Sequence, residues 1–327
     1  MDQKSTRNPY PITYKVGVSD LSSHPTVRGE PYVNIQSLKC MGFQGSKVYQ
    51  SYLAIVHAIK NGYTLVLGFT SNAISGGMRD LITQLCRLKL VHVVVTTGGG
   101  IEEDLIKTVV PFLYSKNPGS DVRLYELGVN RTENIFCLNE GYVWLEQFLN
   151  KLGETPSFYK TDPVSLVSKM SSEINSEESY LHWCYKNGIL VLPLGLEDCA
   201  IGDHFAMKHY ESLWKSQEPP LLNSSVLLPT YLNLLYSRDR PKICVVCLGG
   251  GAPKHFIMNG LIPVGGSDMT LYFNKGDFYE GSNAGAPPEE SISWGKSKVD
   301  SLVHKVYGDF YFTFYLVASQ LIKDFSI

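Results

Sequence analysis

The chain has 327 residues, with 29 basic and 31 acidic side chains and a formal net charge of −2. This balance lacks the basic excess that attracts polyanions, so the composition disfavours DNA or RNA as a partner. Charged residues make up 18% of the sequence, against roughly a quarter in typical soluble domains. A surface that is partly buried between subunits would have this composition, and we therefore expect an oligomer.

The sequence predicts neither a secretion signal nor a membrane span. Its first ten residues contain no apolar core, which a secretory signal would have. The longest apolar run, 310–322, is interrupted by polar residues and is shorter than the roughly 20 residues that cross a bilayer. We therefore expect a cytoplasmic protein without membrane association.

Seven cysteines, an odd number scattered along the chain, are typical of reduced thiols rather than of a disulfide framework. Cys244 and Cys247 have the spacing of a redox or zinc-binding pair. They lie in an apolar, strand-like run, in which residues three apart point to opposite faces. The pattern therefore favours structural cysteines, and no metal site is expected.

Residues 1–40 are rich in proline, serine and other polar residues, which predicts an irregular N-terminal arm. Residues 41–327 are predicted to form a single domain. Its first element is a helix from Ser46 to Lys60, where apolar side chains recur at helical spacing. Ser46 is a suitable N-cap, and Asn61-Gly62 is a suitable stop.

A unit of apolar strand, small polar loop and helix then occurs five times. The strands are predicted at 63–69, 91–95, 189–194, 243–248 and 269–273, and residues 114–188 are predicted to be mostly helices and loops. Repetition of the unit predicts an α/β fold, Rossmann-like and doubly wound, with a mainly parallel sheet and helices on both faces. Ligands of such sheets bind beyond the carboxyl ends of the strands, so the five loops should line one crevice.

Two of these loops contain glycine triplets, Gly98-Gly99-Gly100 and Gly249-Gly250-Gly251. Each triplet follows a strand and precedes a helix, where bare backbone amides can bind the phosphates of a dinucleotide. The spacing Gly-x-Gly-x-x-Gly is absent, and tight strand-to-helix turns would equally require glycine. The triplets alone leave both interpretations open.

Polar residues in the loops have two interpretations as well. Asp198 and Asp203 follow the third strand and could bind ribose hydroxyls or an amine, although aspartate in such loops more often caps a helix. His255 follows the second glycine triplet. It could transfer protons near neutral pH, or it could bond to the backbone at the start of a helix.

The stretch 279–298 has the composition of a binding site. Small residues at 281–286 let a backbone approach a ligand closely. Two prolines then start a short helix that places Glu290 and Trp294 on one face, and Lys296 follows where this helix should end. A carboxylate, an indole and an amine could thus bind a cationic amine, with Lys296 as an imine-forming nucleophile. By itself, a lysine beside a tryptophan is more often a solvated surface residue.

Four segments taken together resemble deoxyhypusine synthase, and the match runs from about Phe43 to the C-terminus. The segments read Thr-Ser-Asn-Ala-Ile-Ser-Gly-Gly-Met-Arg-Asp at 70–80, Thr-Thr-Gly-Gly-Gly-Ile-Glu-Glu-Asp-Leu-Ile-Lys at 96–107, Gly-Gly-Gly-Ala-Pro-Lys-His at 249–255 and Ser-Ile-Ser-Trp-Gly-Lys at 291–296. They are long and occur in the family's order.

This resemblance implies an activity that uses NAD to oxidise spermidine. The aminobutyl part of spermidine passes to an active-site lysine, and then to one lysine of the precursor of translation initiation factor 5A. Lys296 matches the imine-forming lysine and His255 an active-site histidine. The residues matched to spermidine binding are Asp203, Asn283, Glu290 and Trp294.

The resemblance also implies a cofactor site and an assembly. Active sites of the family lie between two subunits of a tetramer. The cofactor contacts that it implies are Ser71, Asn72, Ser75, Thr97, Gly98, Gly99, Glu103, Asp198, Gly250, Gly276 and Asp309.

The chain departs from the family pattern at several of these positions. Asn283 stands where the family has a substrate-binding aspartate, and Ala284 where it has a serine. Loss of one charge-assisted hydrogen bond, about 1.5–3 kcal/mol, would weaken spermidine binding roughly ten- to hundredfold. Three further departures are Lys275 for a threonine near the cofactor, Phe256 for the second histidine of a pair, and Gly76 for a serine in the first nucleotide loop.

Two functional hypotheses follow. The chain is either a working deoxyhypusine synthase subunit in a homotetramer, or a catalytically impaired paralog that completes and activates an active chain in a heterotetramer. A third class, an NAD-binding protein without a role in hypusine formation, is favoured less by the motifs. Assays of the chain alone, of the chain with a paralog, and of cofactor binding would separate them.

Overall fold

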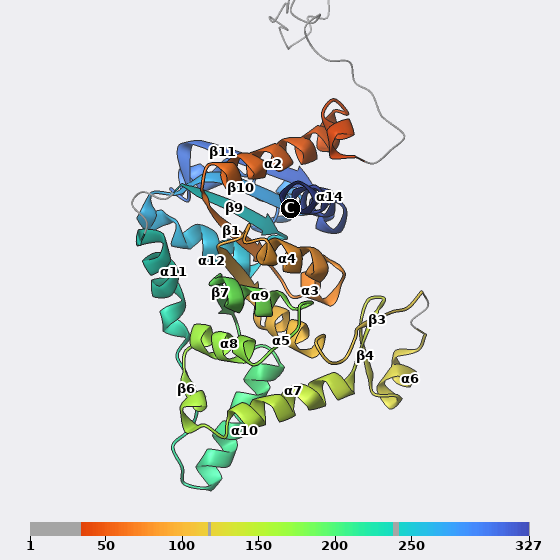
Figure 1. Ribbon diagram of the computed structural model, residues 1–327, viewed down its shortest axis with the longest axis vertical. Helices are drawn as coiled ribbons and strands as arrows, with labels where there is room; N and C mark the ends of the chain where they lie inside the picture. The colour runs from red at the N-terminus through yellow and green to blue at the C-terminus, as the bar shows by residue number, and fades with distance from the viewer. Residues whose placement is uncertain (1–33, 117–118, 238–241, 327) are drawn as a thin grey trace, which may run out of the picture.

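The computed structural model describes residues 34–116, 119–237 and 242–326, and its centre is a six-stranded sheet (Figure 1). The strand order is β11-β10-β9-β1-β2-β7, and each neighbouring pair is parallel. The predicted doubly wound parallel sheet is confirmed. The strands are β1 Thr64–Phe69, β2 Val93–Thr97, β7 Leu190–Leu194, β9 Ile243–Leu248, β10 Ser267–Asn274 and β11 Ser297–Tyr307.

Helices cover both faces of this sheet, because alternate side chains of the buried strands point to opposite sides. Leu67 of β1 and Leu248 of β9 belong to the core on one face, whereas Val66 and Val245 belong to the core on the other. The first core includes α2 Phe43–Lys60, α4 Met78–Arg87, α5 Gly98–Ile106, α9 Tyr180–Asn187 and α14 Phe310–Phe325. The second includes α11 Leu227–Tyr236 and α12 Ala252–Gly260.

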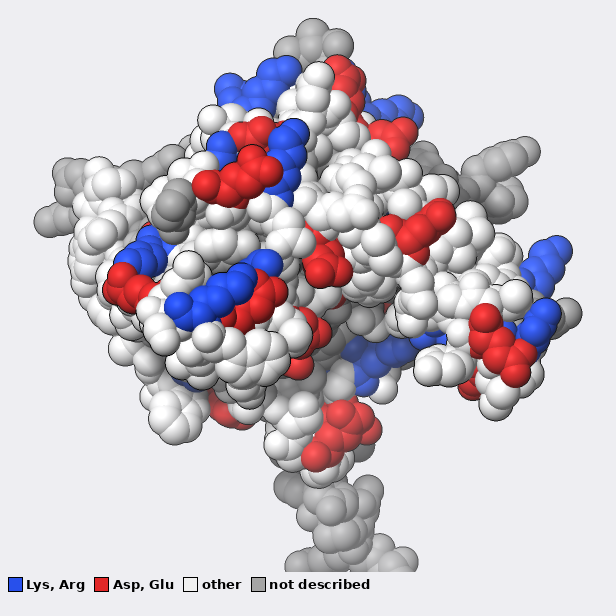
Figure 2. Space-filling view, turned by 90° about the horizontal axis from the view of Figure 1, so that it is seen from below, with Lys and Arg blue, Asp and Glu red and all other residues white. Residues whose placement is uncertain are grey.

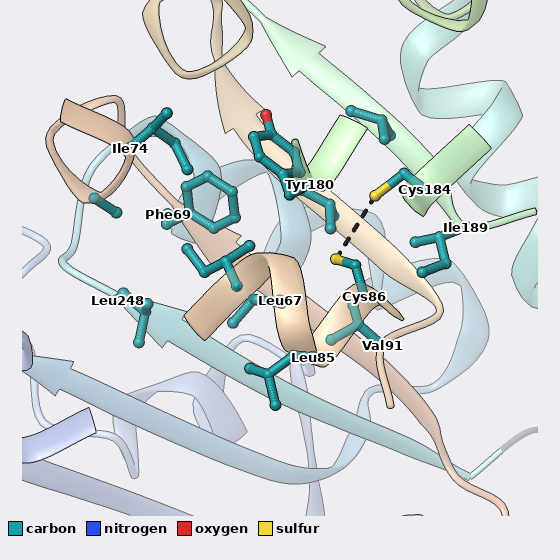
Figure 3. Close-up of a cluster of buried hydrophobic side chains, with 14 of the residues drawn as sticks. Leu67, Phe69, Ile74, Leu85, Cys86, Val91, Tyr180, Cys184, Ile189 and Leu248 are labelled. Carbon is teal, nitrogen blue, oxygen red and sulfur yellow. Dashed lines mark hydrogen bonds between the residues drawn. The ribbon is translucent and has the colours of Figure 1, made fainter. Parts of the chain in front are cut away.

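Part of the first core lies between β1, α4 and α9 (Figure 3). Phe69 and Tyr180 are fully buried, and their rings meet edge to face with centroids 5.8 Å apart. The thiols of Cys86 and Cys184 lie 3.7 Å apart beside them. Burial of each such large side chain contributes about 1.5–3 kcal/mol, so this cluster fixes the helices that precede and follow the site loops.

The paired cysteines of β9 are structural, as predicted. Cys244 belongs to the first core and Cys247 to the second, so the strand holds their thiols on opposite sides of the sheet. Both side chains are fully buried, and burial raises the pKa of each thiol to about 12. They therefore stay protonated at neutral pH and cannot share a metal ion.

Residues 113–138 form a small unit that the sequence pattern did not predict, and we call it the hairpin unit. It consists of α6 Asp121–Glu126 and an antiparallel sheet of β3 Leu113–Tyr114, β4 Val129–Thr132 and β5 Ile135–Leu138. Most of its strand residues are exposed or half-buried, so no alternating apolar pattern marks them in the sequence. Figure 1 shows the unit projecting from the body beside α7 Asn139–Leu152.

The lower part of the molecule in Figure 1 contains β6 and α10 as well as α7. A two-residue parallel ladder joins β6 Lys160–Thr161 to β8 Leu221–Leu222. The other helices are α3 Asn72–Ser75, α8 Pro163–Ser172, α10 Ala200–Trp214 and α13 Glu290–Ser293, and the 3-10 turns are Ile35–Leu38, Pro156–Tyr159, Ser224–Val226, Ile262–Val264 and Phe278–Glu280.

The N-terminal region differs in part from the prediction. Residues 1–33 of the predicted arm lie outside the described residues. The 3-10 turn Ile35–Leu38 belongs to the packed structure, since Ile35 is only 3% exposed. Helix α2 begins at Phe43, three residues before the predicted N-cap, and the Ser46 hydroxyl accepts a hydrogen bond from Gly42 N at 2.9 Å. The domain boundary near residue 41 stays a prediction.

The surface agrees with the balanced composition. Acidic and basic side chains are interspersed on the face shown in Figure 2, with no continuous patch of one sign. Among the helices that the structure describes, none is both long and apolar enough to cross a bilayer.

Candidate active site

Five of the six residues predicted to bind or react with the substrate line one pocket. It lies between α12, β10 and the segment 283–296, and it encloses about 370 Å³, part of which is open to solvent. Its polar lining is formed by Lys254, His255, Tyr272, Asn283, Glu290, Ser291, Trp294 and Lys296. We call it the Lys296 pocket.

The predicted local structure around Lys296 is confirmed. The short helix α13 ends at Trp294, and Gly295 reverses the chain with a left-handed φ of 69°, which glycine adopts without strain. This reversal places the Lys296 Nζ 5.3 Å from the centre of the Trp294 ring. Among the described residues, no side chain or carbonyl accepts a hydrogen bond from this amine.

Buried hydroxyl groups hold the backbone of Lys296 in place. Ser267 at the start of β10 donates its amide to the Lys296 carbonyl at 3.0 Å. The Ser267 hydroxyl lies 2.6 Å from that of Thr270 and 3.0 Å from that of Ser297, and Ser291 of α13 donates to Ser297 at 2.8 Å. Because all four hydroxyls are buried and bonded, they join α13 to both strands and fix the position of Lys296.

His255 faces Asn283 in the same pocket. Burial first, then the charges of Lys296 and Lys254, lower the pKa of His255, and a side-chain hydrogen bond to Asn283 opposes them. The imidazole is therefore neutral at physiological pH and able to accept a proton. The alternative interpretation, in which this ring bonds to the backbone, is not what the structure shows.

Lys254 is a member of the pocket that the sequence analysis left without a role. Its side chain is 8% exposed, and its Nζ donates to the Asn283 carbonyl at 2.5 Å and lies 4.4 Å from the centre of the Tyr272 ring. Burial lowers its pKa. Lys254 thus anchors the loop that carries Asn283. In the sequence, the position of Lys254 next to His255 in the motif 249–255 is the signal that could have assigned it to the pocket.

Asp203 lies elsewhere. It is exposed in the first turn of α10, and it lines a separate pocket between α7 and α10 together with Glu146, His204 and Lys208. Helix α10 follows β7 and Lys296 precedes β11, and these strands form opposite edges of the six-stranded sheet. Five strand spacings of about 4.8 Å separate the two edges by about 24 Å, and Asp203 and Lys296 of one chain line different pockets.

The loops after the strands lie against one another along one edge of the sheet, where Gly99 meets Ser71 and Gly250 meets Ala284. That they line one crevice stays a prediction, but Lys296 does not lie at this edge. Lys296 lies beside the amino end of β10, where Ser267 N bonds to it. Asn283 comes from the loop at the carboxyl end of that strand, and the pocket runs along the strand face that carries Tyr272. The loops after β1 and β7 line other pockets.

The first glycine triplet forms the opening turn of α5 rather than a loop. Gly98, Gly99 and Gly100 have ordinary negative φ values, so close packing, not turn geometry, requires them. A Cβ on Gly98 would lie 2.6 Å from the Cys199 sulfur, and one on Gly99 would lie 2.9 Å from Ser71 Cβ. Thr97 completes the group, because its hydroxyl accepts a hydrogen bond from Ser71 N at 3.2 Å.

Helix α3 places Asn72 and Ser75 beside α5. The Ser75 hydroxyl donates to the Glu103 carboxylate at 2.6 Å. Burial raises the pKa of Glu103 to about 7, although the Ser75 hydrogen bond and Lys107 oppose this rise. Asn72, Ser75 and Asp309 line an open pocket between α3, the hairpin unit and the start of α14, and we call it the α3 pocket.

The other predicted cofactor contacts are more scattered. Asp198 is exposed in the loop after β7 and does not cap α10, whose N-cap is Cys199. Gly250 and Gly276 both lie against Ala284, which occupies the space where side chains on these glycines would extend. Asp309 caps α14 by accepting a hydrogen bond from Tyr311 N at 3.0 Å.

Three departures from the family pattern have structural counterparts. Lys275 forms an ion pair with Asp309 at 3.1 Å. Phe256 packs against Tyr231 in the core, with ring centroids 6.0 Å apart, and does not line the Lys296 pocket. A side chain on Gly76 would overlap the hydroxyl of Tyr311.

These features define a Rossmann-like α/β protein with an exposed lysine pocket beside a parallel sheet. The family model of deoxyhypusine synthase matches residues 34–321, and the chain belongs to that family. It is 37% identical over 274 residues to deoxyhypusine synthase of Musa acuminata, a match that covers 80% of this chain and 70% of that protein. It is 35% identical over 266 residues to homospermidine synthase 2 of Senecio vernalis, covering 78% and 70% of the two chains.

Comparison with solved structures supports the fold. A structure from Entamoeba histolytica, described as a candidate deoxyhypusine synthase, superposes with a TM-score of 0.59 at 22% identity. The match covers 90% of this chain and 96% of that one.

Proposed function

We propose that this chain is a deoxyhypusine synthase subunit that carries the aminobutyl group of spermidine on Lys296 and passes it to the precursor of translation initiation factor 5A. One observation carries the proposal. The unbonded amine of Lys296 shares a pocket with a carboxylate, an indole and a histidine of lowered pKa.

The pocket residues have distinct roles in this proposal. Glu290 attracts an ammonium group of spermidine, and the face of Trp294 contacts the cationic chain. Once oxidation has turned the secondary amine of spermidine into an imine, the Lys296 amine would attack the imine carbon and displace 1,3-diaminopropane, so that the aminobutyl group is held as a new imine on Lys296. His255, held neutral by burial and by two nearby lysines, accepts the proton that the Lys296 amine releases.

The residues around α3 and the start of α5 fit a dinucleotide. Backbone amides at the N-terminus of α5 suit its phosphates, because the first amides of a helix have no partner within the helix. The hydroxyls of Ser71 and Thr97 add donors, and the Glu103 carboxylate suits ribose hydroxyls. Bound NAD would supply the removal and the return of hydride. At the second glycine triplet, Ala284 lies against Gly250 and reduces the space through which a dinucleotide could reach that backbone.

A second subunit completes the site in this proposal. Asp203 would provide a further carboxylate for spermidine, and within one chain it lines a different pocket from Lys296. A neighbouring subunit can place its own Asp203 at this pocket, as the family resemblance implies. The ring of Trp294 lines the Lys296 pocket, and this ring and those of Phe278 and Tyr279 are exposed, which is the type of apolar surface that subunit contacts bury.

Trapping the imine tests the proposal. The chain is incubated with NAD and spermidine labelled in the aminobutyl part, reduced with borohydride, and digested for peptide mapping. We expect label on Lys296 and its loss in Lys296→Ala. Acceptor choice is tested by offering the initiation factor precursor and, separately, a small diamine, because one relative is named homospermidine synthase. Label on another lysine that persists in Lys296→Ala would refute the assignment.

A second candidate function is that of an impaired partner which activates a paralog. The uncharged amide of Asn283 lines the pocket beside His255, where the family has a carboxylate, so the pocket has lost a charge that would hold spermidine. The assay is therefore repeated with the paralog present. No label on this chain, together with strong stimulation of the paralog, would establish the second candidate.

A further inference from the structure

Side chains from two helices bond the carbonyl groups of α3. The Lys107 Nζ donates to the carbonyls of Ile74 at 2.6 Å and Ser75 at 2.7 Å. From the other side, the Tyr311 hydroxyl of α14 donates to the carbonyl of Asn72. Since α3 has only four residues, the Lys107 bonds satisfy the Ile74 and Ser75 carbonyls at its end, and the Tyr311 bond adds a second donor to the Asn72 carbonyl, which also accepts from Gly76 N.

Lys107 is held firmly in this position. Its Nζ also lies 4.8 Å from the centre of the Phe112 ring, so two carbonyls and an aromatic face surround the ammonium group. Burial, followed by the charge of Arg79, lowers its pKa to about 8, and Glu103 opposes this. The group is thus mostly charged at neutral pH, and its hydrogen bonds are of the stronger, charge-assisted kind.

The bonded turn forms a wall of the α3 pocket. Asn72, Ser75, Gly76, Lys107 and Tyr311 all line this pocket. The turn also aims the Ser75 hydroxyl at Glu103. At the next residue, Gly76, the Tyr311 hydroxyl occupies the space that a side chain would take. Movement of the turn would therefore displace two of the groups assigned to the dinucleotide.

We propose that Lys107 and Tyr311 are positioning residues for the dinucleotide, because together they fix the α3 turn from opposite sides and so set the geometry of Ser75 and Glu103. This inference rests on the proposed function, in which the α3 pocket and the start of α5 receive NAD. It predicts that loss of either side chain loosens the turn and weakens NAD binding without reaching the Lys296 pocket.

The experiment combines calorimetry with hydrogen exchange on the full chain. The variants are Lys107→Met, which removes the ammonium group, Lys107→Arg, which keeps a charge, and Tyr311→Phe, which removes only the hydroxyl. Lys169→Met is the matched control, because Lys169 forms an exposed ion pair with Glu173 on α8. The exchange reporters are the amides of Ser75 and Gly76, which bond to Ser71 and Asn72 carbonyls within the turn.

We expect Lys107→Met to weaken NAD binding about tenfold and to speed exchange at both reporters by a similar factor, the usual effect of losing charge-assisted bonds. Tyr311→Phe should have a smaller effect in the same direction, and Lys107→Arg should restore part of the affinity. The Lys296 amide, bonded to Ser291 O, should exchange at the wild-type rate.

Unchanged exchange and affinity in Lys107→Met would overturn the inference. Faster exchange throughout the molecule would also overturn it, because Lys107 would then stabilise the whole fold rather than the turn. If Lys107→Met does not fold, Tyr311→Phe and Lys107→Arg provide the same comparison. Failure of the wild-type chain to bind NAD would refute the proposed cofactor instead, and the exchange rates would still decide whether Lys107 fixes the turn.

Discussion

Asn283 and His255 both line the Lys296 pocket, where burial and two lysine charges lower the pKa of the imidazole while the Asn283 side chain raises it. This interaction couples the residue that departs from the family pattern to the histidine of the pocket. The same loop is anchored through the Asn283 carbonyl by the buried Lys254, so its backbone is held independently of the Asn283 side chain.

Asn283→Asp should therefore change both charge and proton binding. A carboxylate beside the imidazole favours the charged form, so the pKa of His255 should rise by about one unit or more. Spermidine affinity should rise as well, in part, since Ala284 still lacks the family's hydroxyl. Titration of the His255 ring by NMR and calorimetry with spermidine would measure the two effects. A raised pKa with unchanged affinity would show that the loop holds position 283 away from the substrate.

Lys296 is predicted to be the only lysine of the chain that carries the aminobutyl group. Lys298, two residues on, is a built-in comparison, because its Nζ forms an ion pair with Asp268 at 2.7 Å. Lys296→Ala should abolish borohydride-trapped label, whereas Lys298→Ala should retain it. Peptide mapping distinguishes the two lysines. Label on Lys298 in the wild-type chain would contradict the prediction.

The sequence predicted the parallel sheet because each central strand is a continuous apolar run between a polar loop and a helix. It did not reveal β11, whose residues are mostly exposed or half-buried, as is typical of an edge strand with one open side. The hairpin unit was not predicted for the same reason. Short strands with solvated side chains have no periodicity that reports them.

The site shows a similar division. Chain-local spacing predicted that Glu290, Trp294 and Lys296 lie together, because one short helix and one glycine determine their positions. The separation of Asp203 from Lys296 depends on strand order, which no local pattern contains. Lys107 was visible in a motif, but its role depends on contacts with Ile74 and Ser75, more than 30 residues away in the sequence.

Glu103 should make the stability of the chain depend on pH. Burial raises its pKa from 4.5 to about 7, so between these values the folded chain keeps a proton that the unfolded chain has released. The free energy of unfolding therefore falls as pH rises through this window, by roughly 3 kcal/mol at most. Glu103→Gln should remove the decline and be the more stable form at pH 8, but not at pH 4.5.

Denaturant unfolding at these two pH values measures the difference. Glu154→Gln, an exposed substitution, is the control and should leave the pH dependence unchanged. The prediction would be contradicted by a Glu103→Gln chain that is less stable than wild type at pH 8. The attraction between the Glu103 carboxylate and Lys107 would then outweigh the cost of burying the carboxylate charge.

Gly76→Ser, which restores the residue expected from the family, should destabilise this chain. A Cβ at position 76 would overlap the Tyr311 hydroxyl and lie 2.9 Å from a ring carbon. Such overpacking costs about 1–3 kcal/mol. Tyr311→Phe removes the hydroxyl but not the ring, so the serine should cost less in that background. A double-mutant cycle of unfolding free energies would reveal this coupling, and strict additivity would contradict the contact.

The last prediction concerns the shared site, and mixing two inactive variants tests it. Lys296→Ala retains Asp203, and Asp203→Ala retains Lys296. If each site takes Lys296 from one copy and Asp203 from another, a mixed pair has one site with both residues and one with neither. Random exchange makes half of the pairs mixed, so mixing should restore about a quarter of the wild-type imine label, measured after dissociation and reassembly. The restored label must lie on the Asp203→Ala chain, which differential isotope labelling of the two chains would identify. If both residues came from one chain, mixing would restore nothing. If the site needs a different chain as its partner, wild-type homo-oligomers would form no label. Addition of that chain would then stimulate imine trapping, and this stimulation would require Asp203 but persist in the Lys296→Ala variant.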